Sequence, residues 1–341
     1  MKKFEICEQV FKAMGDDVSR KMYRNRIDYS NGSNEAMESM ILSLGGGKDI
    51  VDFMQKNEDN LYIFGAGVLG EVMADTWGWK YKFRAFIDND SAKQGKYIGE
   101  IPVISLDEVI SWETASIIVV NKFHWKEIMD QLLRRGIQRE HIYNFGEIYR
   151  QFNANQYFDL KYLEIKDGER FVDCGALDGE TSLNLCERFG NHISKIWLFE
   201  PDKRNVKKVI ENFKDKTVDY EIIAKGVWSS SIILRFNSLG NGGASIDENG
   251  EDNIETVTLD EALGDSIPTF IKMDIEGAEL EALKGAEKII RNYHPKLAIS
   301  IYHKPEDVDK IPKLLLEYYP NYKFYLRHYS FMNSETILYA L

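Results

Sequence analysis

Two glycine-rich segments, each between an expected strand and an expected helix, constrain the fold of this 341-residue chain most strongly. The first is GAGVLG at residues 65–70, which follows the apolar run LYIF. The second is DCGALDG at residues 173–179, which follows RFV. Glycine turns between a strand and a helix are typical of parallel sheets that helices cover on both faces. We therefore expect an α/β protein with two such units in tandem.

The chain divides into three segments by the pattern of its apolar residues. Residues 1–58 carry helical spacing interrupted by a polar loop and three glycines, which predicts a helical N-terminal segment. Residues 59–148 alternate strands and helices and predict a small Rossmann-like domain, and residues 149–341 restart that alternation. The last two expected strands, YKFYLRHY and ETILYAL, are separated by a short turn and predict a C-terminal antiparallel hairpin.

Charge and composition exclude several classes of function. The net charge is −12 without a long Lys/Arg cluster, which disfavours nucleic acid as a substrate. The N-terminus lacks the apolar core of an export signal, and no run of about 18 apolar residues is present. The three cysteines have no metal-ligand spacing. We expect a cytoplasmic protein without a membrane span, with free thiols.

The first glycine segment matches the GxGxxG pattern at Gly65, Gly67 and Gly70, and Asp88 ends the next expected strand. In a dinucleotide fold these glycines let the backbone approach a pyrophosphate, and the acid accepts hydrogen bonds from ribose hydroxyls. The segment spans only residues 59–148, and no catalytic dyad for hydride transfer follows it. A ligand-binding site, a structural or docking role, and NAD-linked catalysis therefore all stay open.

The second glycine segment pairs with Glu200, which ends the strand after it. This pair fits an adenosyl cofactor without a pyrophosphate. Gly175 and Gly179 let the backbone lie against its methionine part, Asp173 holds its ammonium group or a water, and Glu200 accepts from both ribose hydroxyls. Ligands of open α/β sheets bind beyond the carboxyl ends of the strands, where these residues fall. The expected cofactor-binding residues are Asp173, Gly175, Ala176, Asp178, Gly179, Thr181, Glu200, Pro201 and Gly226.

An acidic cluster and a histidine are expected near the same edge. Asp274, Glu276 and Glu279 lie where a strand ends and a helix begins, and His303 follows the strand KLAISIY. Asp274, His303 and Glu276 are the candidate catalytic residues, because an imidazole with a pKa of about 6.5 suits a general base. Glu279 has the simpler alternative role of meeting the dipole of its helix. Three carboxylates suit Mg²⁺ as well, although we assign no metal ligand.

Two resemblances extend these expectations. The stretches FGAGVLGEVMAD and FRAFIDND resemble the small Rossmann-like domains attached to sugar-modifying transferases, which implies a nucleotide or nucleotide-sugar site. The stretches FVDCGALDGETS, IKMDIEGAE and SIYHKPEDV resemble the FkbM family of methyltransferases, over residues 165–341. The second resemblance implies a class I methyltransferase fold, S-adenosylmethionine as the methyl donor, and O-methylation, often of sugar hydroxyls.

The expected function is therefore S-adenosylmethionine-dependent O-methylation of a hydroxyl on a sugar, glycan or related small molecule. Two alternatives stay open: an NAD-linked oxidoreductase that uses the N-terminal domain, and a non-catalytic module that binds a nucleotide-sugar. The stretch 237–253 is rich in Gly, Asn and acids and is expected to form a lid over the donor or a solvated loop. The sequence does not define the acceptor, the methylated position or the oligomeric state.

Overall fold

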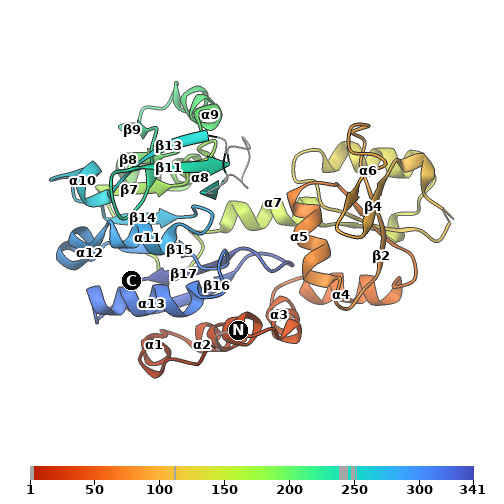
Figure 1. Cartoon of the computed structure of the whole chain (residues 1–341), viewed down its shortest axis with the longest axis horizontal. Helices are drawn as coiled ribbons and strands as arrows, with labels where there is room; N and C mark the ends of the chain where they lie inside the picture. The colour runs from red at the N-terminus through yellow and green to blue at the C-terminus, as the bar shows by residue number, and fades with distance from the viewer. Residues whose placement is uncertain (1–3, 111–112, 238–244, 247–249, 251) are drawn as a thin grey trace. The chain divides into compact units, whose positions relative to one another are not determined.

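The structure is a computed structural model that describes residues 4–110, 113–237, 245–246, 250 and 252–341 (Figure 1). The chain forms two compact units, and neither is a continuous stretch of sequence. Unit 1 comprises residues 1–31, 156–327 and 336–341, and unit 2 comprises residues 32–155 and 328–335.

The centre of unit 1 is a seven-stranded sheet with the order β16-β17-β15-β14-β7-β8-β9. The five strands from β15 to β9 run parallel, and β17 is antiparallel to β15. Reciprocal backbone bonds between Lys323 and Leu341 make β16 antiparallel to β17, so the predicted C-terminal hairpin is confirmed. The strands are β7 (Glu169–Cys174), β8 (Ile193–Phe199), β9 (Tyr220–Ile223), β14 (Phe270–Met273), β15 (Lys296–Ser300), β16 (Phe324–His328) and β17 (Thr336–Ala340).

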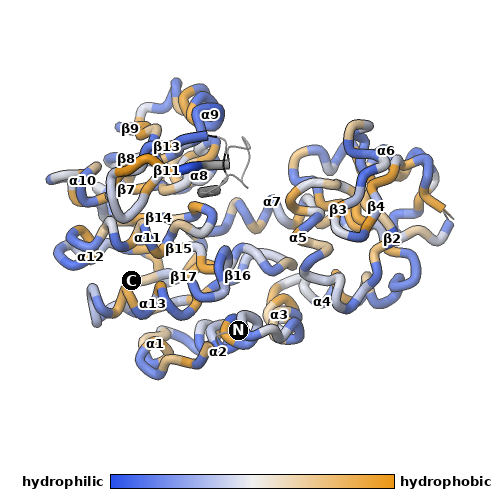
Figure 2. Tube along the Cα trace, viewed as in Figure 1, coloured by the Kyte–Doolittle hydropathy of each residue, from blue (hydrophilic) through white to orange (hydrophobic). Residues whose placement is uncertain are grey.

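Amphipathic helices bury the apolar strands of this sheet. Hydrophobic residues colour much of β8 orange, whereas hydrophilic residues colour α9 largely blue (Figure 2). The helices of unit 1 are α1 (Glu8–Ala13), α2 (Asp17–Ser30), α8 (Glu180–Phe189), α9 (Lys203–Phe213), α10 (Leu259–Leu263), α11 (Glu279–Lys284), α12 (Glu287–Tyr293) and α13 (Asp307–Tyr318). Helices α1 and α2 pack against α13, far away in the sequence (Figure 1).

Two expected elements of unit 1 are interrupted in the structure. The sequence predicts one helix over 278–292, but α11 ends before Gly285 and α12 starts after it. A Cβ atom on Gly285 would lie 2.1 Å from the carbonyl oxygen of Trp228, so only glycine allows this close approach. The strand predicted over 219–228 is divided into β9 and β10 (Gly226–Val227), which belong to different sheets.

A small four-stranded sheet with the order β10-β13-β11-β12 completes unit 1. Its further strands are β11 (Ile233–Asn237), β12 (Ser245–Ile246) and β13 (Asp252–Val257). Most of the predicted lid, residues 238–244, 247–249 and 251, lies outside the described residues.

Unit 2 is a Rossmann-like domain with a six-stranded sheet in the order β3-β4-β2-β1-β5-β6. Its strands are parallel except that β3 is antiparallel to β4. The strands are β1 (Leu61–Phe64), β2 (Phe83–Ile87), β3 (Tyr97–Ile98), β4 (Ile101–Ile104), β5 (Ser116–Val119) and β6 (Ile142–Asn144). The helices are α3 (Asn34–Ile41), α4 (Gly47–Lys56), α5 (Val68–Trp77), α6 (Trp125–Arg134) and α7 (Phe145–Asn155).

The units differ from the linear division expected from the sequence, 1–58, 59–148 and 149–341. The N-terminal helices are shared out, since α1 and α2 belong to unit 1 while α3 and α4 belong to unit 2. The expected boundary at residue 148 falls within α7, a helix that sequence analysis did not predict. Across the described parts of the chain, no helix combines the length and apolar character that a bilayer crossing requires.

Candidate active site

The second glycine segment forms a tight loop after β7 that packs against the end of β14. Gly175 has φ +82°, and a Cβ atom there would lie 2.0 Å from the carbonyl oxygen of Asp274. Gly179 has φ +85°, and a Cβ atom there would lie 2.7 Å from the ring of Phe213. Both the left-handed conformation and the close approach require glycine. The loop is therefore held against the strand end that carries the acidic cluster.

A buried ion pair fixes the start of this loop. The Asp173 side chain is fully buried, and it accepts hydrogen bonds from Lys272 Nζ at 2.9 Å and Ser182 Oγ at 2.6 Å. Lys272 Nζ also donates to the carbonyl oxygen of Gly175 at 2.8 Å. Burial disfavours the charge on Lys272, but the negative charges of Asp173 and Asp274 outweigh it and raise the Lys272 pKa. Both oxygens of the Asp173 carboxylate thus already accept a hydrogen bond within the protein. The predicted contact of Asp173 with the donor's ammonium group stays a prediction.

Lys272 was missed by sequence reasoning, although the sequence carries a signal for it. It is the only charged residue of β14, FIKM, whose four residues are all buried. A lysine in a fully buried strand needs a charged partner. Asp173 on the neighbouring strand β7 is directly paired with it in the sheet register.

Glu200, at the end of β8, also holds the glycine loop. Its Oε2 accepts from the backbone N–H of Leu177, and its Oε1 accepts from that of Asp202, both at 2.9 Å. Leu177 has φ +54°, which is uncommon for a residue with a side chain. Burial raises the pKa of Glu200 despite these hydrogen bonds. The predicted contact with ribose hydroxyls uses the remaining acceptor capacity of this carboxylate.

The other predicted donor residues lie around the same loop and the same edge of the sheet. Ala176 is buried and its N–H donates to the carbonyl oxygen of Phe199. Asp178 caps the backbone N–H of Glu180 at 3.1 Å. Thr181 in α8 and Pro201 after β8 are half-buried, and so is Gly226, which lies in β10 of the small sheet.

Asp274 follows β14 directly and is bound by two tyrosines. Its Oδ2 accepts from Tyr157 Oη at 2.8 Å, and its Oδ1 accepts from Tyr302 Oη at 3.3 Å. Burial opposes ionisation of Asp274, but the positive charges of His303 and Lys272 lower its pKa. Tyr157 was not predicted, because its contact with Asp274 joins residues 117 positions apart in the sequence.

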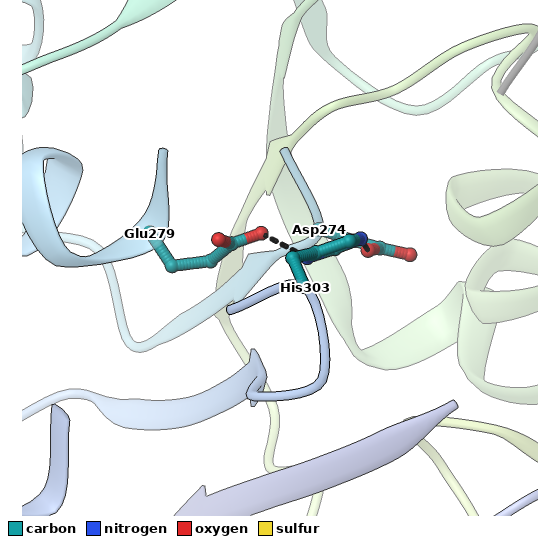
Figure 3. A group of neighbouring side chains, drawn as sticks. All are labelled: Asp274, Glu279 and His303. Atoms are coloured by element: carbon teal, nitrogen blue, oxygen red, sulfur yellow. Dashed lines mark ion pairs between the residues drawn. The ribbon is translucent and has the colours of Figure 1, made fainter. Parts of the chain in front are cut away.

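His303 lies among three carboxylates, of which Figure 3 shows Asp274 and Glu279. Its Nδ1 is 3.0 Å from Glu279 Oε1, and its Nε2 is 3.5 Å from both Asp274 Oδ1 and Glu276 Oε2. Only 9% of its side chain is exposed. Burial disfavours the charged ring, but the charges of these carboxylates outweigh burial and raise the pKa of His303 to about 10.

This pKa changes what His303 contributes at neutral pH. The general-base prediction assumed the ordinary value of about 6.5, at which much of the imidazole is neutral. With a pKa of about 10, the ring keeps its proton and acts as a counter-ion. A neutral ring, which a general base needs, would require some of the negative charge around His303 to be neutralised first. The base role of His303 therefore stays a prediction.

The first glycine segment forms a corresponding loop within unit 2. Gly65 has φ +123°, and a Cβ atom on Gly70 would lie 2.0 Å from the carbonyl oxygen of Gly65. Asp88 Oδ2 accepts from the backbone N–H of Ala66 at 2.9 Å and from Lys93 Nζ at 3.1 Å. Burial opposes ionisation of Asp88, but hydrogen bonds from Asp90 and Ala66 outweigh it and lower the pKa. Gly67 precedes α5, so the predicted residues meet at the ends of β1 and β2.

Sheet order and loop geometry define unit 1 as a class I methyltransferase domain, a class that uses S-adenosylmethionine as methyl donor. The profile of the methyltransferase FkbM domain matches residues 173–326. Residues 173–326 are thus similar to the FkbM methyltransferase domain. A second profile, described as C2185-like, N-terminal, matches residues 57–143 in unit 2.

Among the similar solved structures, one FkbM methyltransferase supports the fold. An FkbM methyltransferase from Methylobacillus flagellatus is 21% identical, with a TM-score of 0.54, and the match covers 92% of this chain and 99% of that chain. Fibrillarin from Aeropyrum pernix, solved with bound S-adenosyl-L-methionine, is 14% identical over 57% of this chain and 76% of that chain, with a TM-score of 0.39. A search of curated proteins gave no match.

Proposed function

We propose that this methyltransferase transfers the methyl group of S-adenosylmethionine to a hydroxyl oxygen of a sugar, glycan or related small molecule in the cytoplasm. One observation carries the proposal. The glycine loop and Glu200 follow β7 and β8, while Asp274 and His303 follow the adjacent strands β14 and β15 at the same edge of one sheet. Two groups of polar side chains therefore lie next to each other.

The donor side is the glycine loop. Glycines at positions 175 and 179 keep the backbone free of side chains where the methionine part of the donor lies. Asp173 and Lys272 support the loop from the protein interior, because their charges are buried and paired with each other. Glu200 holds the loop through Leu177 and accepts hydrogen bonds from the ribose hydroxyls of the donor.

The acceptor side consists of Asp274, His303 and Glu276. Asp274 is ionised, and 24% of its side chain is exposed, so it accepts a hydrogen bond from an acceptor hydroxyl and orients it toward the methyl group. Holding the oxygen in line with the sulfonium methyl supplies much of the rate acceleration without covalent catalysis. The carboxylates then take up the proton that leaves the oxygen.

Separate measurements of donor affinity and turnover test this assignment. We expect Asp274→Asn to bind S-adenosylhomocysteine about as tightly as the wild type, while turnover falls by about 100-fold, the scale for a lost acid–base group. Turnover is measured with S-adenosylmethionine and a panel of nucleotide-sugars and oligosaccharides. Glu281→Gln in α11 is the matched control, because its carboxylate contacts Ser229 and Lys284. Loss of donor binding in Asp274→Asn would place this residue on the donor side instead.

We further propose that unit 2 binds a nucleotide or nucleotide-sugar at its glycine loop. The supporting observation is that Asp88, Ala66 and the N-terminal end of α5 lie together, as nucleotide binding requires. An NAD-linked oxidoreductase is the competing function of this loop, and a structural or docking role is the third. Calorimetry with UDP-glucose and with NAD⁺ separates them, since each function predicts a different ligand or none.

A further inference from the structure

Two neighbouring side chains beside Asp274, those of His303 and Glu279, carry buried polar atoms without a hydrogen-bonding partner among the described residues. Both ring nitrogens of His303 are enclosed and lack a hydrogen bond of regular geometry to any described residue, although Nδ1 forms an ion pair with Glu279 Oε1 at 3.0 Å. The Glu279 side chain is fully buried, and its Oε2 is likewise without a hydrogen-bonding partner in the described structure. Buried polar groups are rarely left in this state, because each unmade bond costs free energy.

The positions of these side chains fit one small cation. Asp274, Glu279 and His303 each offer one ligand atom, and these atoms all lie within 4.8 Å of one another (Figure 3). Ligand atoms lie about 2.0–2.4 Å from a bound divalent ion, so ligands on opposite sides of the ion are about 4.0–4.8 Å apart. The spacing therefore allows one ion to bind both carboxylates and one of the two ring nitrogens of His303.

The protein also holds this arrangement in place. Glu279 Oε1 accepts from the backbone N–H of Ile275 at 2.8 Å, which fixes the carboxylate beside the end of β14. Asp274 is fixed by Tyr157 and Tyr302. Such supporting contacts orient the ligands of protein metal sites. Glu276, with 34% of its side chain exposed, is close enough to His303 to serve as a further ligand.

We propose that Asp274, Glu279 and His303 bind one divalent metal ion. Imidazole together with carboxylates suits an ion that accepts both nitrogen and oxygen ligands, such as Mn²⁺ or Zn²⁺. The burial of the ligands is uneven, because Glu279 is fully buried whereas Asp274 is partly exposed. The coordination sphere therefore has a closed side and a side open to water or to an acceptor hydroxyl.

The consequence for catalysis rests on the proposed methyltransferase function. A divalent ion next to the acceptor hydroxyl lowers the pKa of that hydroxyl, so that its proton leaves more easily. His303 then serves as a neutral ligand and not as the general base. This role explains why a histidine is enclosed by carboxylates at the position where the acceptor must react.

Metal binding is measured on the full-length chain after treatment with a chelator and dialysis, without any acceptor. Calorimetric titrations with MnCl₂ and with ZnCl₂ should each show one ion bound per chain. When the protein is added to Mn²⁺, the electron paramagnetic resonance signal of free Mn²⁺ should decrease by one ion per chain. Glu279→Gln and His303→Asn should weaken binding by more than about 10-fold, at least the effect of removing a group that supports a metal site. Glu281→Gln should bind as the wild type does.

Two results would overturn the proposal. One is a wild-type chain that binds neither Mn²⁺ nor Zn²⁺ stoichiometrically, which would leave His303 as a simple counter-ion of the carboxylates. The other is equal metal affinity in the wild type and all three variants, which would place the ion elsewhere. The wild-type result does not depend on whether a variant folds. S-adenosylhomocysteine affinity is measured on the same samples, so a failed metal site and a failed methyl-donor site give different outcomes.

Discussion

At the scale of single residues, the two glycine loops use their acids in the same way. Glu200 accepts from the backbone N–H of Leu177, and Asp88 accepts from that of Ala66, so each carboxylate holds the loop that precedes it. Sequence position alone predicts an acid at these strand ends. It does not show that part of each carboxylate is already occupied by the loop. Both acids therefore have a structural role in addition to any contact with a ligand.

The candidate site was predictable only in part, and the reasons differ from residue to residue. Asp274 follows β14 directly, Glu276 and Glu279 lie between it and the first turn of α11, and His303 follows β15 within three residues, so the expected order of the sheet places them at one edge. The contact of Tyr157 with Asp274 depends on the chain path over 117 positions, which no local pattern contains. The pKa of His303 was also not predictable, because it depends on three carboxylates meeting around one buried ring.

Lys272→Met should destabilise unit 1 strongly. The substitution keeps the length of the side chain but leaves Asp173 buried without its cation, which typically costs about 3–5 kcal/mol of the free energy of unfolding. Urea denaturation followed by circular dichroism measures this loss. Lys284→Met, at an exposed ion pair with Glu281, should cost at most about 1 kcal/mol. Equal losses in the two variants would show that the buried pair is not what holds the loop.

Gly67→Val should remove nucleotide binding by unit 2 while the fold persists. A Cβ atom at this position meets nothing within 4 Å, and the backbone is extended there, so valine is tolerated by the protein itself. A bound phosphate, in contrast, needs that space. Calorimetry with UDP-glucose compares the variant with the wild type, and the melting temperature controls for folding. Gly70→Val is the opposite case, because its side chain would collide with the Gly65 carbonyl and lower the melting temperature.

At the scale of secondary-structure elements, the sequence predicted the kinds of strands and helices better than their ends. Apolar runs such as FIKM and KLAIS are strands because helices cover both faces of the sheet. The break between α11 and α12 was missed because it depends on the Trp228 carbonyl, which packs against Gly285 from a distant part of the chain. Helix α7 was missed as well, and it starts immediately after β6.

Asp16 links α2 to β16 and makes the stability of unit 1 depend on pH. It caps α2 through Ser19 N and contacts Arg327 Nη2 at 2.6 Å. Burial opposes ionisation, but Arg327 and Ser19 outweigh it and lower the Asp16 pKa to about 2. Because this pKa is lower in the folded chain than the ordinary aspartate value of 3.8, the stabilisation is complete above about pH 4 and is lost as the pH falls through 2.

Asp16→Asn should therefore make the free energy of unfolding depend less on pH in this acidic range. The variant keeps a capping side chain but loses the ion pair, so we expect it to be less stable than the wild type at pH 7, by about 1 kcal/mol. The difference between the two proteins should shrink as the pH falls from 5 to 3. Urea denaturation at each pH measures it, and a difference that grows on acidification would contradict the assigned shift.

At the scale of the whole molecule, the two compact units are interleaved in sequence. Residues 1–31 complete unit 1, and residues 328–335 complete unit 2, where Trp77 Nε1 donates to the Phe331 carbonyl at 2.9 Å. Local periodicity cannot reveal such an exchange, because it records which face of an element is apolar but not which other element covers it. The alternation of strands and helices was enough to predict the α/β class.

Deletion of residues 1–31 should destabilise unit 1 although no strand of its sheet is removed. Met22, Tyr23 and Ile27 of α2 are buried within this unit, so the deletion exposes the apolar surface that they cover. We expect a lower urea midpoint for the far-ultraviolet signal and weaker binding of S-adenosylhomocysteine at 37 °C. An unchanged midpoint would show that residues 156–341 do not need residues 1–31 to fold, as the division into 1–58, 59–148 and 149–341 implies.

The central claim is that the second glycine loop binds the methyl donor with Glu200 on its ribose, and calorimetry with S-adenosylhomocysteine tests it most directly. The wild type and the Glu281→Gln control should bind one molecule per chain with the same affinity. Glu200→Ala should bind about 10- to 100-fold more weakly, the effect of losing hydrogen bonds to a charged acceptor. Glu200→Gln, which keeps the side-chain length, should lie between them. Equal affinity in the wild type and Glu200→Ala, or no binding by the wild type, would contradict the account.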